Sequence, residues 1–459
     1  MKLPLWRIAE FTGAKGEIDQ DAVAMDYSID SRTLSPGDLF IAIRGERFDG
    51  HDFVPAALEK GAVAAIVQSG RSLAAAERLL FVDDTLQALQ AMGAAARRLW
   101  GKSLIAVTGS AGKTTTKEIL AHLLAQRFRV MKSSGNLNNH IGMPLQLLKL
   151  EAEHDIAVVE MGMNHPGEIR ALGKLAHHDL AIVTCVAPVH LEFFKSVAEI
   201  ARAKYELIES LHSGGTAVLN ADDEYVSQFG RDFHGKVLTF GIKRPADVCA
   251  QNIQLRGVEG SSFELVTGGV REQVALPLAG EHNIYNALAA SAAALERGIT
   301  PSQVASALST VAPPDKRGQV LELVGTTIIN DCYNSNPSAL KAMIDVLAGT
   351  KASRRILVAG EMLELGELAE ALHRECGVYA AEKKIDVVIG VRGLAKSLSD
   401  AAGEAGVEAH FMETADQAGE WLARELCPGD AVLLKASRGV KLERALEMVT
   451  GKLDQVRNL

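Results

Sequence analysis

Runs of apolar residues separated by polar turns divide the first part of the chain into short strands and helices. Residues 1 to about 82 carry brief apolar runs, such as 39–43, between turns rich in glycine and aspartate, and this pattern predicts a small α/β unit. An alanine-rich stretch over 85–100 follows, with Asp83 and Asp84 before it as possible caps. We expect this stretch to form a helix that links the small unit to the rest of the chain.

The middle of the chain, from 103 to about 312, alternates strand patterns with helical patterns. Each strand pattern is a short apolar run of the kind that is buried on both faces of a sheet. The predicted strands cover 103–107, 155–161, 180–186 and 216–219. Because strands that alternate with helices are typical of parallel sheets, this segment is predicted to be a parallel-sheet domain.

Two prolines, Pro313 and Pro314, interrupt this alternation, and a second alternating series begins after them. Its strand patterns cover 328–329, 356–358, 387–389 and 431–434. The series predicts a Rossmann-like domain, although it lacks the Gly-x-Gly-x-x-Gly sequence that dinucleotide binding needs after a strand. We therefore expect an α/β protein of three domains, which cover 1–100, 101–313 and 314–459.

The composition fits a folded protein that binds small molecules. The 459 residues are 47% hydrophobic and carry a formal net charge of −9, so the chain can bury large cores but lacks the clustered positive charge that nucleic-acid binding requires. Five cysteines lie far apart without a Cys-x-x-Cys pair, which argues against a disulfide framework and a zinc site. Neither a signal-peptide core nor an apolar stretch of about 18 residues occurs. We expect a cytoplasmic protein without stable membrane insertion.

The sequence TGSAGKTTT, at 108–116, predicts a phosphate site. It follows the strand pattern 103–107 and precedes a helical pattern over 117–128, so its glycines fall in a strand-to-helix turn. Backbone N–H groups of such a turn, the N-terminal end of the helix and the charge of Lys113 all attract a polyphosphate. The common P-loop spacing would place glycine at Val107, so this is a shortened form. The alternative is a glycine turn with a solvated lysine.

Candidate metal ligands stand in the turn and near two strand ends. Thr114 offers a hydroxyl to a magnesium ion on the phosphates. Glu160 closes a predicted strand, and His190 follows the next one by a short loop. Ligands of open parallel sheets bind beyond the carboxyl ends of strands, so both side chains are expected at the edge that holds the phosphate turn. The alternatives are a capping or surface role for Glu160 and a hydrogen-bonded loop histidine at position 190.

Lys204 interrupts the apolar stripe of a predicted helix. The helix begins with a capping box formed by Ser196 and Glu199, and Lys204 falls on the face that carries Ile200 and Leu207. A bare ammonium on that face is costly unless it is paired or chemically modified. The alternative is a lysine whose stem is buried while its ammonium reaches solvent.

Taken in order, these segments resemble the Mur ligase family, the ATP-dependent amide-forming enzymes of peptidoglycan precursor synthesis. The resemblance covers nearly the whole chain. The stretches that carry it are DSRTLSPGDLFIAIRGERFDGHDF (30–53), TGSAGKTTT (108–116), GNLNNHIGMP (135–144), VVEMGMNHPGEI (158–169), HLEFFKSVAEIARAKYEL (190–207), GEHNIYNALAA (280–290), NDCYNSNPSAL (330–340) and GEMLELG (360–366). Two of these stretches, GNLNNHIGMP and NDCYNSNPSAL, resemble most closely the family member that adds D-alanyl-D-alanine.

The resemblance implies that ATP and Mg²⁺ are cofactors and assigns residues to each. The residues that would hold ATP are Gly109, Ser110, Ala111, Gly112, Lys113, Thr114 and Thr115 at the phosphates, His282 and Asn283 near the adenine, and Arg317 and Asp331 at phosphate and ribose. The residues that would hold Mg²⁺ are Thr114, Glu160, His190 and Lys204, the last as a carbamate. The carbamate would turn a buried cation into an anion that supports a second magnesium.

The resemblance also implies substrate and catalytic roles. Ser31 and Arg32, with the neighbourhood of Gly50 and His51, would hold the UDP-sugar end. The residues that would act in catalysis are Lys113, Lys204, His190, Asn138 and Asn139, the two asparagines lining the channel where the acceptor carboxylate meets the γ-phosphate. The residues that would receive the incoming dipeptide are Tyr333, Asn334 and Asn336.

The implied reaction joins D-alanyl-D-alanine to UDP-N-acetylmuramoyl-tripeptide through an acyl phosphate, in a monomer. Three positions depart from the family pattern: Cys332 where serine is expected, Ser335 where alanine is expected and Glu361 where aspartate is expected. These departures concern substrate contacts and leave the reaction unchanged. The alternatives are another Mur ligase, a folylpolyglutamate-type amide ligase, or a P-loop nucleotide switch that performs no ligation.

Overall fold

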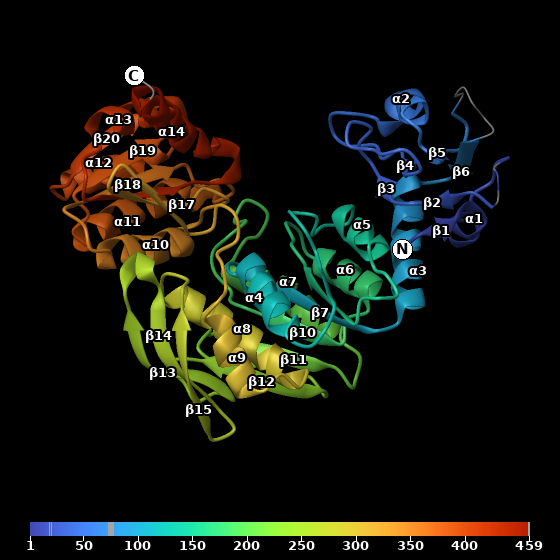
Figure 1. Ribbon diagram of the computed structural model, residues 1–459, viewed down its shortest axis with the longest axis horizontal. Helices are drawn as coiled ribbons and strands as arrows, with labels where there is room; N and C mark the ends of the chain where they lie inside the picture. The colour runs from blue at the N-terminus through green and yellow to red at the C-terminus, as the bar shows by residue number, and fades with distance from the viewer. Residues whose placement is uncertain (18, 20, 72–77, 458–459) are drawn as a thin grey trace. The chain divides into compact units, whose positions relative to one another are not determined.

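The computed structural model describes residues 1–17, 19, 21–71 and 78–457 (Figure 1). Within these residues the chain forms two compact units. The first unit comprises Met1–Ala106, Arg127–Ala181 and Glu206–Gly215, and the second comprises Val107–Gln126, Ile182–Tyr205 and Thr216–Leu459. Three elements contribute residues to both units, namely β7 (Ser103–Thr108), β10 (Leu180–Val183) and α7 (Val197–Glu209).

The N-terminal part of the first unit is the small α/β structure that the apolar runs predict. Its elements are β1 (Leu3–Pro4), α1 (Leu5–Thr12), β2 (Val23–Ala24), β3 (Tyr27–Ser28), β4 (Leu39–Ile41), η1 (Gly50–Phe53), α2 (Val54–Glu59), β5 (Ala64–Gln68), β6 (Leu79–Val82) and α3 (Thr85–Trp100). Strands β3, β4, β5 and β6 form a parallel sheet in that order. Side chains alternate along each strand, so Ile41 packs toward α3 while Phe40 packs toward α2.

The predicted linker helix is confirmed as α3, with the same bounds as the prediction. Asp84 caps it, because its side chain accepts hydrogen bonds from the backbone N–H groups of Leu86 and Gln87. Gly101 ends it in the left-handed conformation that favours glycine. Near its C-terminal end, Arg97 donates to the carbonyl of Ala176 at 2.7 Å, which fixes α3 to another part of the first unit.

The remainder of the first unit carries the strand that ends at Glu160. Its elements are β8 (Val130–Lys132), α5 (Gly142–Leu148), β9 (Ile156–Glu160) and α6 (Glu168–Ala176). Strand β9 is buried along its whole length and pairs in parallel with β8. The strand predicted over 180–186 is shorter in the structure, where β10 ends at Val183.

The second unit begins at Val107, so it contains the phosphate turn and the helix after it, and it continues into a mixed sheet. Its elements up to residue 308 are α4 (Lys113–Leu124), β11 (Thr216–Asn220), η3 (Val226–Gln228), β12 (Lys236–Gly241), β13 (Val248–Leu255), η4 (Gly257–Glu259), β14 (Ser261–Thr267), β15 (Val270–Leu276), α8 (Glu281–Glu296) and α9 (Pro301–Leu308). Strands β11, β12 and β13 pair in parallel, whereas β14 and β15 extend the sheet in antiparallel fashion. This extension adds to the parallel sheet that the sequence predicts.

The C-terminal part of the second unit is the predicted Rossmann-like structure. Its elements are β16 (Gln319–Leu323), β17 (Thr326–Asp331), α10 (Pro337–Gly349), β18 (Arg354–Gly360), η5 (Gly366–Leu368), α11 (Ala369–Glu382), β19 (Val387–Val391), α12 (Ala395–Glu404), β20 (Glu408–Met412), α13 (Ala415–Glu425), β21 (Asp430–Lys435), η6 (Arg438–Val440) and α14 (Glu443–Arg457). The strand order is β16, β17, β21, β18, β19, β20, and β16 alone in this order pairs antiparallel within the described residues.

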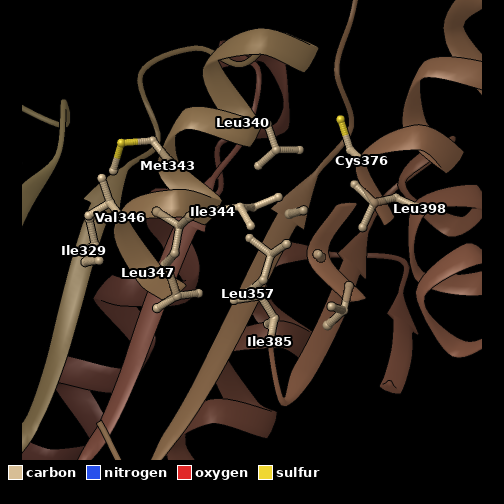
Figure 2. Close-up of a cluster of buried hydrophobic side chains, with 14 of the residues drawn as sticks. Ile329, Leu340, Met343, Ile344, Val346, Leu347, Leu357, Cys376, Ile385 and Leu398 are labelled. Carbon is tan, nitrogen blue, oxygen red and sulfur yellow. The ribbon is translucent and has the colours of Figure 1, made fainter. Parts of the chain in front are cut away.

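Helices cover both faces of this sheet. On one face, Leu340, Ile344 and Leu347 of α10 pack against Leu357 of β18, as Figure 2 shows. Residues of α13 and α14 pack against the neighbouring positions of the same strands, such as Ile356. Because successive side chains of a strand point to opposite faces, the continuous apolar strands are buried on both sides. The loops that follow β17, β18 and β21 are thereby held at one edge of the sheet.

Two further predictions concern the chain as a whole. All five cysteines are free thiols, so no disulfide framework forms. In the part of the chain that the structure describes, no helix combines the length and the apolar character that crossing a membrane requires.

Candidate active site

The phosphate turn joins β7 to α4 and depends on its two glycines. Gly109 has φ +150° and Gly112 has φ +80°. A Cβ atom at Gly109 would lie 1.9 Å from Thr184 Oγ1, and one at Gly112 would lie 2.2 Å from Asn286 Oδ1. Helix α4 begins at Lys113, four residues before the helical pattern predicts, so its N-terminal end is part of the turn. This is the geometry that attracts phosphate.

Side chains from neighbouring elements hold the turn in place. Thr184 Oγ1 donates to the carbonyl of Ala111 at 2.5 Å, and the backbone N–H of Ala187 donates to Ser110 Oγ at 2.9 Å. Within the turn, Lys113 Nζ donates to the carbonyl of Gly109 at 2.9 Å. The support from Thr184 was missed by the sequence analysis, because no local spacing links that residue to the turn.

Lys204 is buried, with only 2% of its surface exposed. Burial, and to a smaller extent the charge of Lys113, lowers the pKa of its ammonium to about 7, although Cys185 acts in the opposite direction. The solvent-reaching alternative is therefore wrong. A pKa near 7 leaves much of the amine neutral at neutral pH, and the neutral amine is the form that can react with carbon dioxide.

His190 lies in the loop between β10 and α7, in a left-handed conformation with φ +56°. Its Nδ1 atom is 2.6 Å from Glu364 Oε2. Glu364 follows β18, and the hydrogen bond from His190 lowers the pKa of its carboxyl. Glu364 falls in the quoted stretch GEMLELG, but nothing in the spacing of that stretch links it to position 190. The histidine is hydrogen-bonded, as its alternative interpretation expects.

Glu160 and Asn138 meet in the first unit. Glu160 ends β9 with 5% of its surface exposed, so the surface-carboxylate alternative is wrong. Its Oε1 atom accepts a hydrogen bond of 2.9 Å from Asn138 Nδ2. Asn139 acts differently, because its Oδ1 atom accepts from the backbone N–H groups of Ile141 and Gly142 at the start of α5. The structure therefore gives Asn138 a partner in the candidate metal site and Asn139 a local structural contact.

The predicted adenine residues lie at the start of α8. Asn283 Nδ2 donates to the carbonyl of Ala279 at 2.8 Å, and Asn286 Nδ2 donates to Asn283 Oδ1 at 3.0 Å. Because Asn286 also closes over Gly112, this short chain of amides connects the start of α8 to the phosphate turn. Burial of the His282 ring lowers its pKa to about 4, so this ring is neutral at neutral pH.

The loop after β17 gathers the predicted ribose and dipeptide residues. Lys435, at the end of β21, donates from Nζ to Asp331 Oδ2 and, at 2.9 Å, to the carbonyl of Asn334. The Arg317 guanidinium carbon is 4.0 Å from the centre of the Tyr333 ring. Lys435 is buried, and because its position continues an apolar strand, no sequence pattern singles it out.

Asn336 and Arg438 each have a partner nearby. Asn336 Oδ1 accepts from the backbone N–H of Ala339 and caps α10. Arg438 faces Tyr333, with its guanidinium carbon 5.6 Å from the ring centre. The Tyr333 ring therefore has two arginines close to it, Arg317 and Arg438, and the second was missed by the sequence analysis.

The candidate UDP-sugar residues lie in the loop after β3. Arg32 is 87% exposed in its side chain and pairs with Asp30 at 2.7 Å. Lys60 Nζ donates to the carbonyl of Arg32 at 2.6 Å and to that of Ser31 at 3.3 Å. His51 is buried, and its ring lies between Asp49 Oδ1 at 2.6 Å and the backbone N–H of Gln68 at 2.9 Å. Its contacts are internal, whereas Arg32 is open to solvent.

Among the three departures from the family pattern, the side chains of Cys332 and Glu361 have hydrogen-bond partners, whereas the buried Ser335 hydroxyl has none among the described residues. The buried Cys332 thiol donates to the carbonyl of Leu434 at 3.5 Å, and burial raises its pKa. Ser335 is also buried, and its backbone N–H donates to Asn334 Oδ1 at 2.9 Å. Glu361 Oε1 accepts from the backbone N–H of Leu394 at 3.1 Å.

The candidate donor set suits a hard cation. A carboxylate at Glu160, an imidazole nitrogen at His190 and the Thr114 hydroxyl are ligand types that accept magnesium or a close relative. Among the described residues, no cluster of three or more His, Cys, Asp or Glu side chains forms a ready metal site. A carbamate on Lys204 would offer further oxygen ligands.

A glycine turn between a strand and a helix, with a lysine at its end, defines a P-loop-like class of nucleotide-binding proteins. Three family descriptions match the chain in detail: "Mur ligase family, catalytic domain" over residues 27–128, "Mur ligase middle domain" over 107–294 and "Mur ligase, glutamate ligase domain" over 316–438. The chain belongs to the Mur ligase family. The predicted resemblance and the three-domain α/β architecture are thereby confirmed.

Individual relatives match over almost their full length. The UDP-N-acetylmuramoyl-tripeptide–D-alanyl-D-alanine ligase of Bacillus subtilis is 36% identical over 438 residues, which cover 93% of each chain. A crystal structure of MurF from Acinetobacter baumannii has a TM-score of 0.90 at 29% identity and covers 98% of this chain and 99% of its own. MurF from Thermotoga maritima in complex with ADP has a TM-score of 0.83 at 30% identity, with coverage of 94% and 98%.

Proposed function

We propose that the protein is an ATP-dependent, ADP-forming ligase that joins D-alanyl-D-alanine to UDP-N-acetylmuramoyl-tripeptide in peptidoglycan precursor synthesis. The observation that carries this proposal is the full-length similarity to the Bacillus subtilis enzyme of that name, at 36% identity over 93% of the chain. The buried Lys204, whose pKa responds to the charge of Lys113, supports a ligase over a simple nucleotide switch, because a switch needs no such residue.

The chemical problem is to bring two anions together. The terminal carboxylate of the tripeptide must attack the γ-phosphate of ATP, and the amine of D-alanyl-D-alanine then displaces phosphate from the acyl phosphate. Lys113 opposes the charge repulsion at the phosphates, and the N-terminal end of α4 adds to its effect. The Mg²⁺ ions that the site accepts supply further charge neutralisation when bound. Holding the amine beside the acyl phosphate makes the second step effectively intramolecular.

The proposed roles follow the positions described above. The residues that bind the phosphates of ATP are Gly109, Ser110, Ala111, Gly112, Lys113, Thr114 and Thr115. The other residues that bind ATP are His282, Asn283, Arg317 and Asp331. The residues that bind Mg²⁺ are Thr114, Glu160, His190 and carbamylated Lys204. The catalytic residues are Lys113, Lys204, His190, Asn138 and Asn139. The substrate residues are Ser31, Arg32, Asn138, Tyr333, Asn334 and Asn336. We also propose functional boundaries at 1–100, 101–313 and 314–459, and a cytoplasmic monomer that binds no nucleic acid.

Coupled phosphate release tests the function. With Mg²⁺, ATP and UDP-N-acetylmuramoyl-tripeptide, we expect release that depends on added D-alanyl-D-alanine. Turnover with a different amine would instead assign another Mur ligase or a folylpolyglutamate-type activity. Release that is indifferent to every amine would contradict ligation and favour the nucleotide switch.

A further inference from the structure

Two loops that are distant in sequence meet around His190. Besides the contact of 2.6 Å between His190 Nδ1 and Glu364 Oε2, the backbone N–H of Glu192 donates to the carbonyl of Glu364 at 3.4 Å. A Cβ atom at Gly366 would lie 3.0 Å from the carbonyl oxygen of Leu191. The loop after β18 therefore packs closely against the loop after β10, and Gly366 permits this approach.

Both members of the pair adopt an unusual backbone conformation. His190 has φ +56° and Glu364 has φ +64°, and side chains other than glycine rarely occupy this left-handed region. Strained residues persist where the surrounding structure determines them, and such positions concentrate at functional sites. The left-handed backbone conformations of these two residues are an observation independent of the short distance between their side chains.

The contact determines which ring nitrogen can bind a cation. A carboxylate accepts hydrogen bonds, so the proton of the neutral His190 ring belongs on Nδ1, and Nε2 keeps its lone pair. Metal-binding histidines commonly donate their other N–H to a carboxylate, which fixes the tautomer and the ring orientation. Glu364 provides this arrangement from a loop that follows β18.

We propose that Glu364 is a positioning residue for His190, holding the ring so that Nε2 faces the divalent cation of the ligase reaction. The inference rests on the proposed function, because it takes His190 as a metal ligand. It adds a role that the ligase assignment alone does not require. Since Glu364 belongs to the C-terminal segment, the histidine reaches its binding orientation only when the two loops are in contact.

A purely stabilising ion pair is a poorer explanation. The side chains of His190 and Glu364 are 24% and 43% exposed, and exposed pairs contribute little to folding stability. Replacing Glu364 should therefore weaken cation binding strongly and change the melting temperature little. That separation makes the proposal testable in the folded, full-length protein.

The test measures Mn²⁺ binding by electron paramagnetic resonance in the presence of a non-hydrolysable ATP analogue. We expect Glu364→Ala to weaken the Mn²⁺ affinity attributed to His190 by about 10-fold to 100-fold, the usual range for such outer partners of metal ligands. Glu364→Gln should lose less, because its amide oxygen can still accept from Nδ1. The matched control is Glu367→Ala, an exposed glutamate of η5, three residues after Glu364, which should bind Mn²⁺ as the unmodified protein does. Melting temperatures should agree across the set.

A second readout needs no metal. In protein labelled with ¹⁵N-histidine, the His190 resonances, identified by their loss in His190→Ala, should show a protonated Nδ1. Glu364→Ala should shift the proton toward Nε2. Unchanged Mn²⁺ affinity in Glu364→Ala, together with weaker affinity in His190→Ala, would overturn the positioning role and leave the ligase assignment intact. Unchanged affinity in both variants would remove His190 from the metal site and the inference with it, while amine-dependent ligation by the unmodified protein would still stand.

Discussion

Lys113 and Lys204 illustrate at the residue scale how position changes the chemistry of one side chain. Lys113 lies at the N-terminal end of α4 with its ammonium bonded to the carbonyl of Gly109. Lys204 is buried in α7, and its ammonium pKa is lowered to about 7. The interruption of an apolar stripe predicts the burial of Lys204, because a helical face can be read from spacing. The contacts of Thr184, Glu364 and Lys435 could not be predicted, because tertiary packing alone creates them.

Replacing Lys113 tests the phosphate site. Lys113→Ala should lower kcat by about 10²-fold or more, the typical cost of removing one preorganised donor from charge that develops in the transition state. Binding of UDP-N-acetylmuramoyl-tripeptide, measured by calorimetry, should change little. Lys174→Ala, which removes an exposed lysine on α6, is the control. Near-normal turnover of Lys113→Ala would show that the phosphate site is misplaced.

Replacing Lys204 tests the proposed carbamate. Lys204→Ala should lose most of its phosphate-release activity because the oxygen ligands disappear, and added acetate should restore part of it by occupying the vacated position. Lys204→Arg should not respond to acetate, since the guanidinium fills the space and keeps a positive charge. Full activity of the alanine variant without acetate would contradict the carbamate.

At the scale of elements, local patterns predict helices better than strand pairing. Helix α3 has its predicted bounds because its cap and its terminal glycine are adjacent in sequence. Helix α4 begins at Lys113 instead of 117, because the phosphate turn supplies polar residues to its first turn. The antiparallel β14 and β15 were not predicted, because β15, with the sequence VREQVAL, has polar residues at its exposed positions and resembles a surface segment.

The junction between α6 and β10 carries a pH-sensitive histidine. His178 is buried, its Nε2 lies 3.0 Å from the carbonyl of Leu207, and its Nδ1 has no hydrogen-bond partner among the described residues. Burial lowers the pKa of His178 from 6.5 to about 4. Between these values the unfolded chain binds a proton that the folded chain does not, so the free energy of unfolding should decrease as the pH falls from 6.5 to 4.

Urea unfolding across this pH range measures the effect. At about 1.4 kcal/mol per pKa unit, the contribution of His178 is at most about 3.5 kcal/mol. His178→Gln retains a donor for the carbonyl of Leu207 but does not titrate, so its unfolding free energy should depend less steeply on pH. Equal slopes for the two proteins would contradict the assignment, whatever the difference in their stability at neutral pH.

At the scale of the whole molecule, the alternation of strand and helix predicts the three-domain α/β architecture that the solved relatives share. Apolar periodicity carries this information because a sheet covered on both faces requires buried strands and amphipathic helices in alternation. The partners of distant loops are not encoded locally, so the contact of His190 with Glu364 required the structure. The domain boundaries near 100 and 313 remain predictions.

Transfer of isotope from substrate to phosphate tests the central claim most directly. UDP-N-acetylmuramoyl-tripeptide labelled with ¹⁸O in its terminal carboxylate is incubated with ATP, Mg²⁺, D-alanyl-D-alanine and the protein, and the released phosphate is analysed by mass spectrometry. Ligation through an acyl phosphate requires that one carboxylate oxygen leave with the phosphoryl group, so each phosphate released should carry one ¹⁸O while the amide product keeps the other. Unlabelled phosphate, or phosphate released without formation of the amide, would contradict the account.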